Sequence, residues 1–309
     1  MGAQMDKPVV EKTTETAEGH GLRVGASAMQ GWRREMEDQH TVLTSVPQLP
    51  GHSLIAVYDG HGGKATAEVA AERMVAYVAK QPEFKQYVRG GPSLTADGAA
   101  LLGAALRGAF LELDRDLPRF LAAKVGKEGG GAKGVPPSGS TACLVIVTPK
   151  HLVCANLGDS RACYAGAEGV TALSEDHKPS LPAERARIEA ADGHVLMDRV
   201  DGSLAMSRAL GDLELKDASM DQLKQKVSPE PEVVVAERLP TDTVMVVACD
   251  GIFDVMSNDA ACEHALTLLA EGEADMGLVA EEMLDECLDL DSKDNMSVVV
   301  VAFPAAKVG

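Results

Sequence analysis

Three aspartates stand at the edges of apolar runs that are typical of buried strands. They are Asp59 after residues 54–58, Asp250 after residues 244–249, and Asp294 before residues 297–301. A carboxylate at such a position is unfavourable unless something compensates its charge. Three carboxylates that converge without a matching basic cluster are typical ligands of a hard divalent cation, Mg²⁺ or Mn²⁺. The sequence therefore predicts a metal-dependent enzyme.

Two of these aspartates stand in similar phrases, DGHGG at 59–63 and DGIFD at 250–254. The glycine that follows each acid lets the backbone turn sharply and bring a carbonyl close to a ligand. Asp250 and Asp254 are four residues apart, so a helical turn after Asp250 would let both carboxylates share a further cation. A solvent-facing Asp254 is equally compatible with the spacing.

Two further groups near these aspartates could act on a phosphate ester. The segment GWRREMED at 31–38 contains three acids and two arginines, which alone would indicate a solvated charged turn. Beside a carboxylate–metal site, however, an arginine can bind two phosphate oxygens. His61 lies two residues after Asp59. A lone histidine is usually structural, but here it could donate the proton that a leaving alkoxide needs.

The overall composition narrows the functional class. The chain has 309 residues, with 29 basic and 47 acidic side chains and a net charge of −18. Such a surface repels nucleic acid and anionic membrane, so we expect no nucleic-acid partner. No apolar stretch approaches the length of a membrane span, so we expect no transmembrane segment.

The six cysteines show neither a C-x-x-C pair nor the spacing of zinc ligands. Several lie in apolar runs, where cysteine behaves as a small hydrophobic residue. Reduced thiols and the lack of a signal peptide indicate an intracellular protein. We expect a cytoplasmic location, with nuclear or transiently membrane-associated pools as alternatives.

The start of the chain, MGAQMD, raises the question of lipidation. Gly2 follows the first methionine, but position 6 is Asp6 rather than the serine or threonine of the usual myristoylation pattern. One myristoyl chain binds membranes only weakly, and an acidic surface adds no attraction. We therefore expect at most a weak membrane contact through myristoylation of Gly2.

The remaining patterns predict the elements that must hold these residues. Residues 1–20 are polar and indicate a flexible lead-in, and the glycine-rich tract 125–139 indicates a flexible loop. Helical spacing of apolar residues predicts helices, and short apolar runs between turn signals predict antiparallel strands. The predicted helices cover 64–80, 99–123 (which Pro118 could break), 182–191, 258–271 and 276–288, and the predicted strands cover 22–29, 52–58, 141–147, 151–156, 161–164, 232–236, 244–249 and 297–301. Strands interrupted by paired helices predict a sheet core covered by helical hairpins.

Taken together, the phrases resemble the protein phosphatase 2C (PP2C, PPM) family of metal-dependent protein serine/threonine phosphatases. They occur in the family's order and span about 22–303. The matching phrases are GWRREMEDQH (31–40), AVYDGHGG (56–63), GDSRA (158–162), DHKP (176–179), GSLAMSRALGD (202–212), CDGIFDVMSN (249–258) and DSKDNMSVVV (291–300). The start MGAQMDKP is similar to the myristoylated amino terminus of metazoan A/B-type members.

The resemblance implies an α+β fold, a four-layer α-β-β-α sandwich in which two antiparallel sheets are each flanked by a pair of antiparallel helices. A single phosphatase domain over 21–305 would follow the lead-in 1–20. A flap at about 178–202 would lie beside the active site, where it would influence the choice of substrate. For this architecture we expect a monomer.

The resemblance also implies a site for two Mg²⁺ or Mn²⁺ ions. Asp59 would bridge both ions, and Asp250 and Asp294 would complete the protein ligands of the first. The carbonyl of Gly60 would bind the second ion. The implied reaction is hydrolysis of phosphoserine and phosphothreonine in phosphorylated proteins, by direct attack of a water or hydroxide that bridges the ions.

Further roles follow from the same resemblance. Glu37 and Asp38 would hold metal-bound waters. Arg33 would bind the phosphate, and His61 would protonate the leaving serine or threonine oxygen. Asp159 matches the site of a weaker third ion, which it would share with Asp250 and Asp254.

Three alternatives are less compatible with these residues. A non-catalytic binding module would be expected to lack at least one metal-binding acid, yet the complete set is present. A two-metal hydrolase of nucleotides or small phosphoesters finds no support, because the chain has no Walker-type glycine loop. A thiol mechanism would need a cysteine in a C-x5-R pattern, which the sequence lacks.

Overall fold

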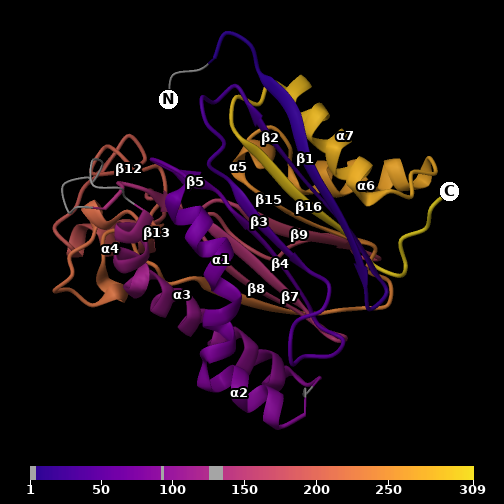
Figure 1. Ribbon diagram of the computed structural model, residues 1–309, viewed down its shortest axis with the longest axis horizontal. Helices are drawn as coiled ribbons and strands as arrows, with labels where there is room; N and C mark the ends of the chain where they lie inside the picture. The colour runs from indigo at the N-terminus through magenta and orange to yellow at the C-terminus, as the bar shows by residue number, and fades with distance from the viewer. Residues whose placement is uncertain (1–4, 92–93, 125–134) are drawn as a thin grey trace.

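The computed structural model describes residues 5–91, 94–124 and 135–309. Two antiparallel sheets pack face to face, and helices cover their outer faces (Figure 1). The strand order is β1-β2-β16-β15-β9-β10 in the first sheet and β14-β8-β7-β4-β3 in the second. This arrangement is the four-layer α-β-β-α sandwich that the family resemblance implies.

The strands of the first sheet are β1 (Val9–Gly19), β2 (Leu22–Gly31), β9 (Arg161–Gly166), β10 (Gly169–Ala172), β15 (Val244–Ala248) and β16 (Met296–Ala302). Those of the second sheet are β3 (Gln39–Leu43), β4 (Ser53–Tyr58), β7 (Ala142–Val147), β8 (His151–Leu157) and β14 (Glu232–Glu237). The second sheet is covered by α1 (Ala65–Lys80) and α3 (Ala96–Lys124), with α2 (Pro82–Arg89) beside them, and the first by α6 (Asn258–Ala270) and α7 (Met276–Asp289).

Strand β15 shows why the central strands appear in the sequence as unbroken apolar runs. Val244, Val246 and Ala248 point into the core beneath α6 and α7. Met245 and Val247, which alternate with them, point into the core between the two sheets. Because both faces of the strand are covered, both sets of side chains must be apolar.

The prediction that residues 1–20 form a flexible lead-in is wrong for residues 9–19. These residues form β1, which pairs with β2 from Val9 opposite Gly31 to Gly19 opposite Leu22. The strand lies at the edge of its sheet and most of its side chains are exposed, so its sequence lacks the apolar alternation that marks a buried strand.

The break that Pro118 could cause in the second helix does not occur, because α3 is continuous through this residue. Leu113 and Leu117 before the break point and Leu121 after it are all buried against the same core. A proline removes one backbone hydrogen bond from a helix interior. Here the packing of both halves on the sheet outweighs that loss.

The segment after Asp176 forms a small subdomain beside the sandwich. It contains α4 (Pro182–Ala190), which the sequence predicts, and the hairpin β11 (Val195–Leu196) with β12 (Arg199–Val200). Its apolar residues form a separate small core, to which Val227 contributes. The flap therefore has a core of its own, and that core extends beyond the predicted limit of 202.

A second small feature connects distant parts of the chain. The short strands β5 (Gly60–His61), β6 (Gly139–Ser140) and β13 (Leu210–Gly211) form a sheet in the order β13-β6-β5. Gly139 ends the glycine-rich tract 125–139, of which residues 125–134 lie outside the described part of the chain. Among the helices of the described residues, none is both long enough and apolar enough to span a bilayer.

Candidate metal centre

The predicted metal-binding aspartates come from both sheets and meet at one end of the sandwich. Asp59 follows the last residue of β4, Asp250 begins the short helix α5 (Asp250–Phe253) after β15, and Asp294 precedes β16. Strand β4 lies against β15 and β16 across the space between the sheets. Because β4 and β15 both run toward this end and β16 starts from it, the three carboxylates become neighbours.

Asp59 lies at the centre of this cluster. Burial raises the pKa of its carboxyl well above the ordinary value, and the charge of Asp250 raises it further. Asp38, Asp159 and Asp294 add smaller contributions of the same sign. Each carboxylate therefore opposes the ionisation of the others, which is the electrostatic condition that a bound cation relieves.

The backbone around Asp59 is held by Thr141, at the start of β7. The Thr141 amide donates a hydrogen bond to the Asp59 carbonyl (2.9 Å), and the Asp59 amide donates to Thr141 Oγ1 (3.0 Å). Thr141 Oγ1 also lies 2.7 Å from Ser160 Oγ, next to Asp159. One threonine thus fixes the spacing of two predicted metal-binding acids, a role that its sequence context does not reveal.

Asp38 is buried, with 3% of its surface exposed, and neither carboxylate oxygen has a hydrogen-bond partner. Burial raises its pKa to about 7; nearby Ser297 and Cys249 oppose this rise, and the charge of Asp294 adds to it. An unpartnered buried carboxylate is strongly disfavoured in a folded protein. This residue therefore fits a site in which water or a cation completes its interactions.

The acids predicted for a third ion, Asp159 and Asp254, lie close enough to Asp250 to affect its carboxyl, and Asp254 is exposed to solvent. Burial raises the pKa of Asp250 well above its ordinary value, followed by the charges of Asp159, Asp294 and Asp254. The turn after Asp250 is helical, as the spacing to Asp254 requires for a shared site. Asp159 is buried, and its Oδ2 accepts a 2.5 Å hydrogen bond from Lys178 Nζ while Oδ1 has no partner.

Gly60 and Glu37 approach each other so closely that position 60 must be glycine. A Cβ at Gly60 would overlap the Glu37 carbonyl oxygen. The Glu37 amide donates to Asn295 Oδ1 (2.9 Å), and Asn295 Nδ2 donates to the carbonyls of Gln30 (2.8 Å) and Glu35 (3.0 Å). Asn295 therefore anchors the loop 30–37 to the start of β16. Burial raises the pKa of Glu37.

Arg33 forms an ion pair with the predicted metal ligand Asp294, from Nη2 to Oδ2. Both side chains remain partly exposed, at 39% and 29%. The other carboxylate oxygen of Asp294 accepts a 2.8 Å hydrogen bond from the Asn295 amide. The structure thus brings Arg33 to the carboxylate cluster, where its guanidinium can be reached by a phosphate.

His61 lies in β5 and contacts a residue that the sequence does not single out. Its Nε2 is 2.8 and 2.9 Å from the two carboxylate oxygens of Asp212, and its Nδ1 is buried without a hydrogen-bond partner. Burial lowers the pKa of His61, but the charge and hydrogen bond of Asp212 outweigh this effect and raise it.

The residues present fit Mg²⁺ or Mn²⁺. All donors of the cluster are oxygens, both carboxylate oxygens of Asp38 and Oδ1 of Asp159 have no hydrogen-bond partner, and the acids raise one another's pKa. Within residues 5–91, 94–124 and 135–309, no three His, Cys, Asp or Glu side chains form a ligand set for one ion by themselves. Backbone oxygen and water would therefore have to complete the coordination, as they commonly do for Mg²⁺.

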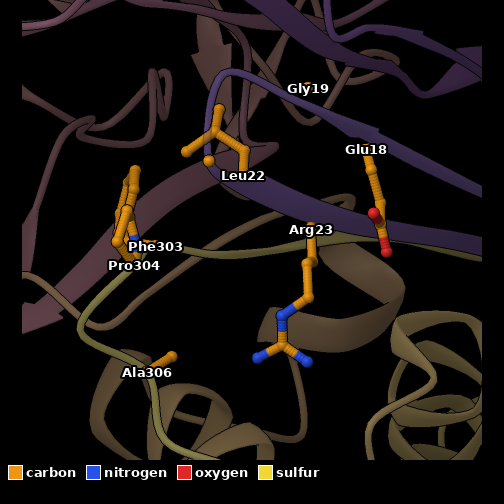
Figure 2. A pocket seen from close by; sticks show the side chains of 8 residues that line it. Glu18, Gly19, Leu22, Arg23, Phe303, Pro304 and Ala306 are labelled. Carbon is orange, nitrogen blue, oxygen red and sulfur yellow. The ribbon is translucent and has the colours of Figure 1, made fainter.

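A separate cavity of about 380 Å³ lies at the opposite end of the sandwich, where β16 ends (Figure 2). It is lined by Leu22, Arg23 and Phe303 among others, and Glu18 is its only carboxylate. None of the predicted site residues borders it. This cavity is therefore separate from the carboxylate cluster.

Comparison with known proteins decides the family. Residues 22–296 match the family described as Protein phosphatase 2C. The chain belongs to this family. It is thus a member of a family of protein phosphatases, hydrolases of phosphate esters, and the prediction made from its phrases is confirmed.

Curated relatives agree with this result. The phosphatase is 41% identical over 309 residues to Protein phosphatase 1A of Homo sapiens, covering 99% of this chain and 77% of the human protein. It is also 41% identical over 315 residues to Protein phosphatase ppm-1.A of Caenorhabditis elegans, covering 99% of this chain. It spans 64% of the length of the worm protein, which is less than two thirds.

Solved structures show the same fold. A phosphatase from a pathogenic strain of Toxoplasma gondii is 27% identical, with a TM-score of 0.75, over 95% of this chain and 96% of its own. The serine-threonine phosphatase 2C of Toxoplasma gondii superposes with a TM-score of 0.78 over 98% of this chain and all of its own, at 23% identity. The α+β sandwich of the phosphatase is therefore that of known phosphatases.

Several residues that shape the site were not predicted to have a role. Asp212, Asn295 and Lys178 each belong to a matching phrase, yet nothing in the phrase shows which atom the side chain contacts. For the residues that were predicted, the structure gathers the acids with Arg33 and His61 at one end of the sandwich. Their individual roles in catalysis and metal binding stay predictions.

Proposed function

We propose that this chain hydrolyses phosphoserine and phosphothreonine in proteins, using two Mg²⁺ or Mn²⁺ ions and a weaker third ion. The observation that carries the proposal is the convergence of buried carboxylates whose pKa values are raised by burial and by one another's charge. Such a cluster is unfavourable without a cation. Membership of the protein phosphatase 2C family supports the reaction class.

In this proposal, Asp59, Asp250 and Asp294 hold the two ions together with the Gly60 carbonyl. The third, weaker ion would lie near Asp159, where Asp250 and Asp254 also contribute charge. Bound ions supply positive charge to the phosphate and lower the pKa of the attacking water. The protein's contribution is to fix the carboxylates in place, because both sheets supply them from rigid strand ends.

The remaining side chains act on the substrate and on water. Glu37 and Asp38 would accept hydrogen bonds from waters at the site, for which the unpartnered oxygens of Asp38 are suited. Arg33, which pairs with Asp294, would orient the phosphate through two guanidinium hydrogens. His61 would donate a proton to the serine or threonine oxygen as the P–O bond breaks.

Phosphate release from a phosphothreonine peptide tests the proposal. We expect release with Mn²⁺ or Mg²⁺, none in excess EDTA, and none from Asp59→Asn or Asp250→Asn. The matched control is Asp291→Asn. Asp291 is an exposed aspartate close to Asp294 in the sequence, and Asp291 forms its ion pair with Lys293. Calorimetric titration with Mn²⁺ should show weakened binding in the two site variants only. Full activity in EDTA or in Asp250→Asn would refute the proposal.

The same assay separates the alternative functions. Folded protein that binds Mn²⁺ but releases no phosphate from any substrate would indicate a binding module. Faster release from nucleotides than from phosphopeptides would indicate a small-molecule hydrolase.

We further propose that the protein acts as a cytoplasmic monomer, with nuclear or transient membrane-associated pools, and that Gly2 is myristoylated. Gly2 lies outside the described residues, and the proposal rests on the likeness of the MGA start to lipidated relatives. Light scattering after gel filtration tests the monomer, and fluorescence imaging of the tagged chain tests the location. An intact mass from a eukaryotic host without the acyl group would contradict the lipidation.

A further inference from the structure

The contact between His61 and Asp212 joins residues that are 151 positions apart in the sequence. The small sheet β13-β6-β5 creates it. His61 pairs with Gly139 on one side, and Gly139 pairs with Gly211 on the other, immediately before Asp212. Three segments of the chain therefore converge at this contact. They place the two carboxylate oxygens of Asp212 at 2.8 and 2.9 Å from one ring nitrogen, Nε2 of His61.

Gly139 leaves room for this contact. A Cβ at this position would overlap both Asp212 Oδ2 and His61 Nε2. Any side chain at 139 would therefore push the carboxylate and the ring apart. A glycine between two strands normally weakens a sheet, so its presence here indicates that close approach of the two groups is the more important requirement.

The backbone of Asp212 also departs from what packing alone would favour. Its φ of 46° and ψ of 42° lie in the left-handed region, which side chains other than glycine, asparagine and aspartate seldom adopt. The Asp212 amide donates a 3.1 Å hydrogen bond to the Ser138 carbonyl, which holds this conformation. The side chain is 9% exposed. Aspartate adopts this backbone state more readily than most residues, and here the state places a buried carboxylate directly against the histidine.

The geometry also distinguishes the two ring nitrogens of His61. A carboxylate accepts hydrogen bonds and donates none, so Nε2 must carry a hydrogen toward Asp212. Nδ1 has no partner in the described part of the chain and is buried. Nδ1 is therefore the nitrogen whose hydrogen-bonding capacity remains unused, and the carboxylate prevents the ring from turning over to exchange the two nitrogens.

We propose that Asp212 is a positioning residue for His61 and makes Nδ1 the atom that protonates the leaving serine or threonine oxygen. The proposal rests on the proposed phosphatase function. As the phosphorus–oxygen bond breaks, its electron pair stays on the leaving oxygen, which takes the Nδ1 proton. The attacking water forms the new phosphorus–oxygen bond and loses a proton to solvent. His61 is left neutral with its Nε2 hydrogen on Asp212, and solvent restores the Nδ1 proton.

A comparison of leaving groups tests this role. A threonine alkoxide needs a proton to leave, whereas p-nitrophenolate does not, so only the peptide reaction depends on a positioned acid. For Asp212→Asn we expect kcat on a phosphothreonine peptide to fall about 10²-fold, a usual share for acid catalysis, with p-nitrophenyl phosphate changed less than about 3-fold. Asparagine tolerates the left-handed backbone, so the variant should fold. The double variant His61→Gln/Asp212→Asn should be no slower on the peptide than His61→Gln alone.

Two matched variants sharpen the comparison. Asp291→Asn changes an exposed aspartate with φ 72° outside the flap and should leave the hydrolysis of both substrates unaffected. Gly139→Ala keeps both side chains but separates them, and should reproduce the selective loss on the peptide. Equal losses on both substrates in Asp212→Asn, or no loss on either, would overturn the proposal, because a structural role or no role would then explain the residue.

Nitrogen-15 NMR of the histidine ring in the Mg²⁺-loaded protein supplies a readout that does not depend on turnover. We expect a protonated Nε2 in the wild type and loss of this fixed tautomer in Asp212→Asn. A neutral ring with its hydrogen on Nδ1 in the wild type would overturn the proposal. If neither substrate is hydrolysed but the spectrum shows Nε2–H on Asp212, the proposed phosphatase function fails while the geometric assignment stands.

Discussion

Replacement of Glu184 by glutamine should destabilise the flap and, with it, the fold. Glu184 is 3% exposed and lies in α4. Its carboxylate accepts hydrogen bonds from Arg187 Nη1 (2.6 Å) and Arg208 Nη2 (2.6 Å), and from the Ser207 hydroxyl. The carboxylate thus ties α4 to the segment that leads into Asp212.

The magnitude follows from the pKa of this group. Burial alone would raise the pKa of Glu184, but the two arginines and Ser207 lower it from 4.5 to about 2. A carboxyl with that change gains about 3 kcal/mol of folding free energy at neutral pH. For a domain of this size, the loss corresponds to a Tm lower by about 5 °C.

Thermal unfolding followed by circular dichroism measures the effect. Glu189→Gln on the same helix is the matched control, because Glu189 is exposed and 3.8 Å from Arg185, and it should change Tm by less than about 1 °C. The lowered pKa means that the stabilisation is complete above about pH 4.5 and is lost as pH falls toward 2. The difference in Tm should therefore be constant between pH 6 and 8 and shrink below about pH 4.5. A Glu184→Gln variant with the same Tm as the Glu189→Gln control would refute the reasoning.

Two other predictions concern packing. Gly25→Ala in β2 should destabilise the protein by about 1–3 kcal/mol, because its Cβ would overlap the Met276 carbonyl at the start of α7. Denaturant unfolding measures this, with Gly90→Ala as a control whose Cβ meets nothing closer than 3.4 Å, and equal midpoints for the two variants would contradict the reasoning. All six cysteines are buried and unpaired, so fewer than about one thiol should react with Ellman's reagent in the native state and all of them after unfolding. Rapid reaction of several thiols in the native protein would show that the core opens.

The sequence predicts the central layers well because each buried strand and helix carries its own apolar signal. The unbroken apolar run Val244–Ala248, for example, predicts a strand that is buried on both faces. The edge strand β1 was missed because most of its residues, threonines and glutamates among them, are exposed and leave no apolar alternation in the sequence. Helix α2 is too short for a reliable apolar period, and only its packing against α1 and α3 reveals it.

The predicted site depended on a different kind of information. The acids themselves could be recognised because a charge at the end of a buried strand is anomalous wherever it occurs. Asp212 could not, since its meaning arises only when Gly139 and His61 are brought beside it from positions far away in the chain. The same holds for Thr141, whose hydroxyl looks ordinary until it is found on the Asp59 amide. The roles of these two residues are therefore set by long-range contacts, which the residue types alone do not reveal.

The pairing of β1 with β2 determines which part of the protein lies near a group attached at the start of this strand. Val9 lies opposite Gly31, and the Met5 amide donates to the Trp32 carbonyl (2.9 Å), next to Arg33. The other terminus leaves from the far end of α6, where the Gly309 amide donates to the Leu269 carbonyl (2.9 Å). A tag or fusion partner attached close to Met5 would therefore lie near Arg33 and the predicted metal-binding acids. One attached close to Gly309 would lie beside α6 instead, away from those acids.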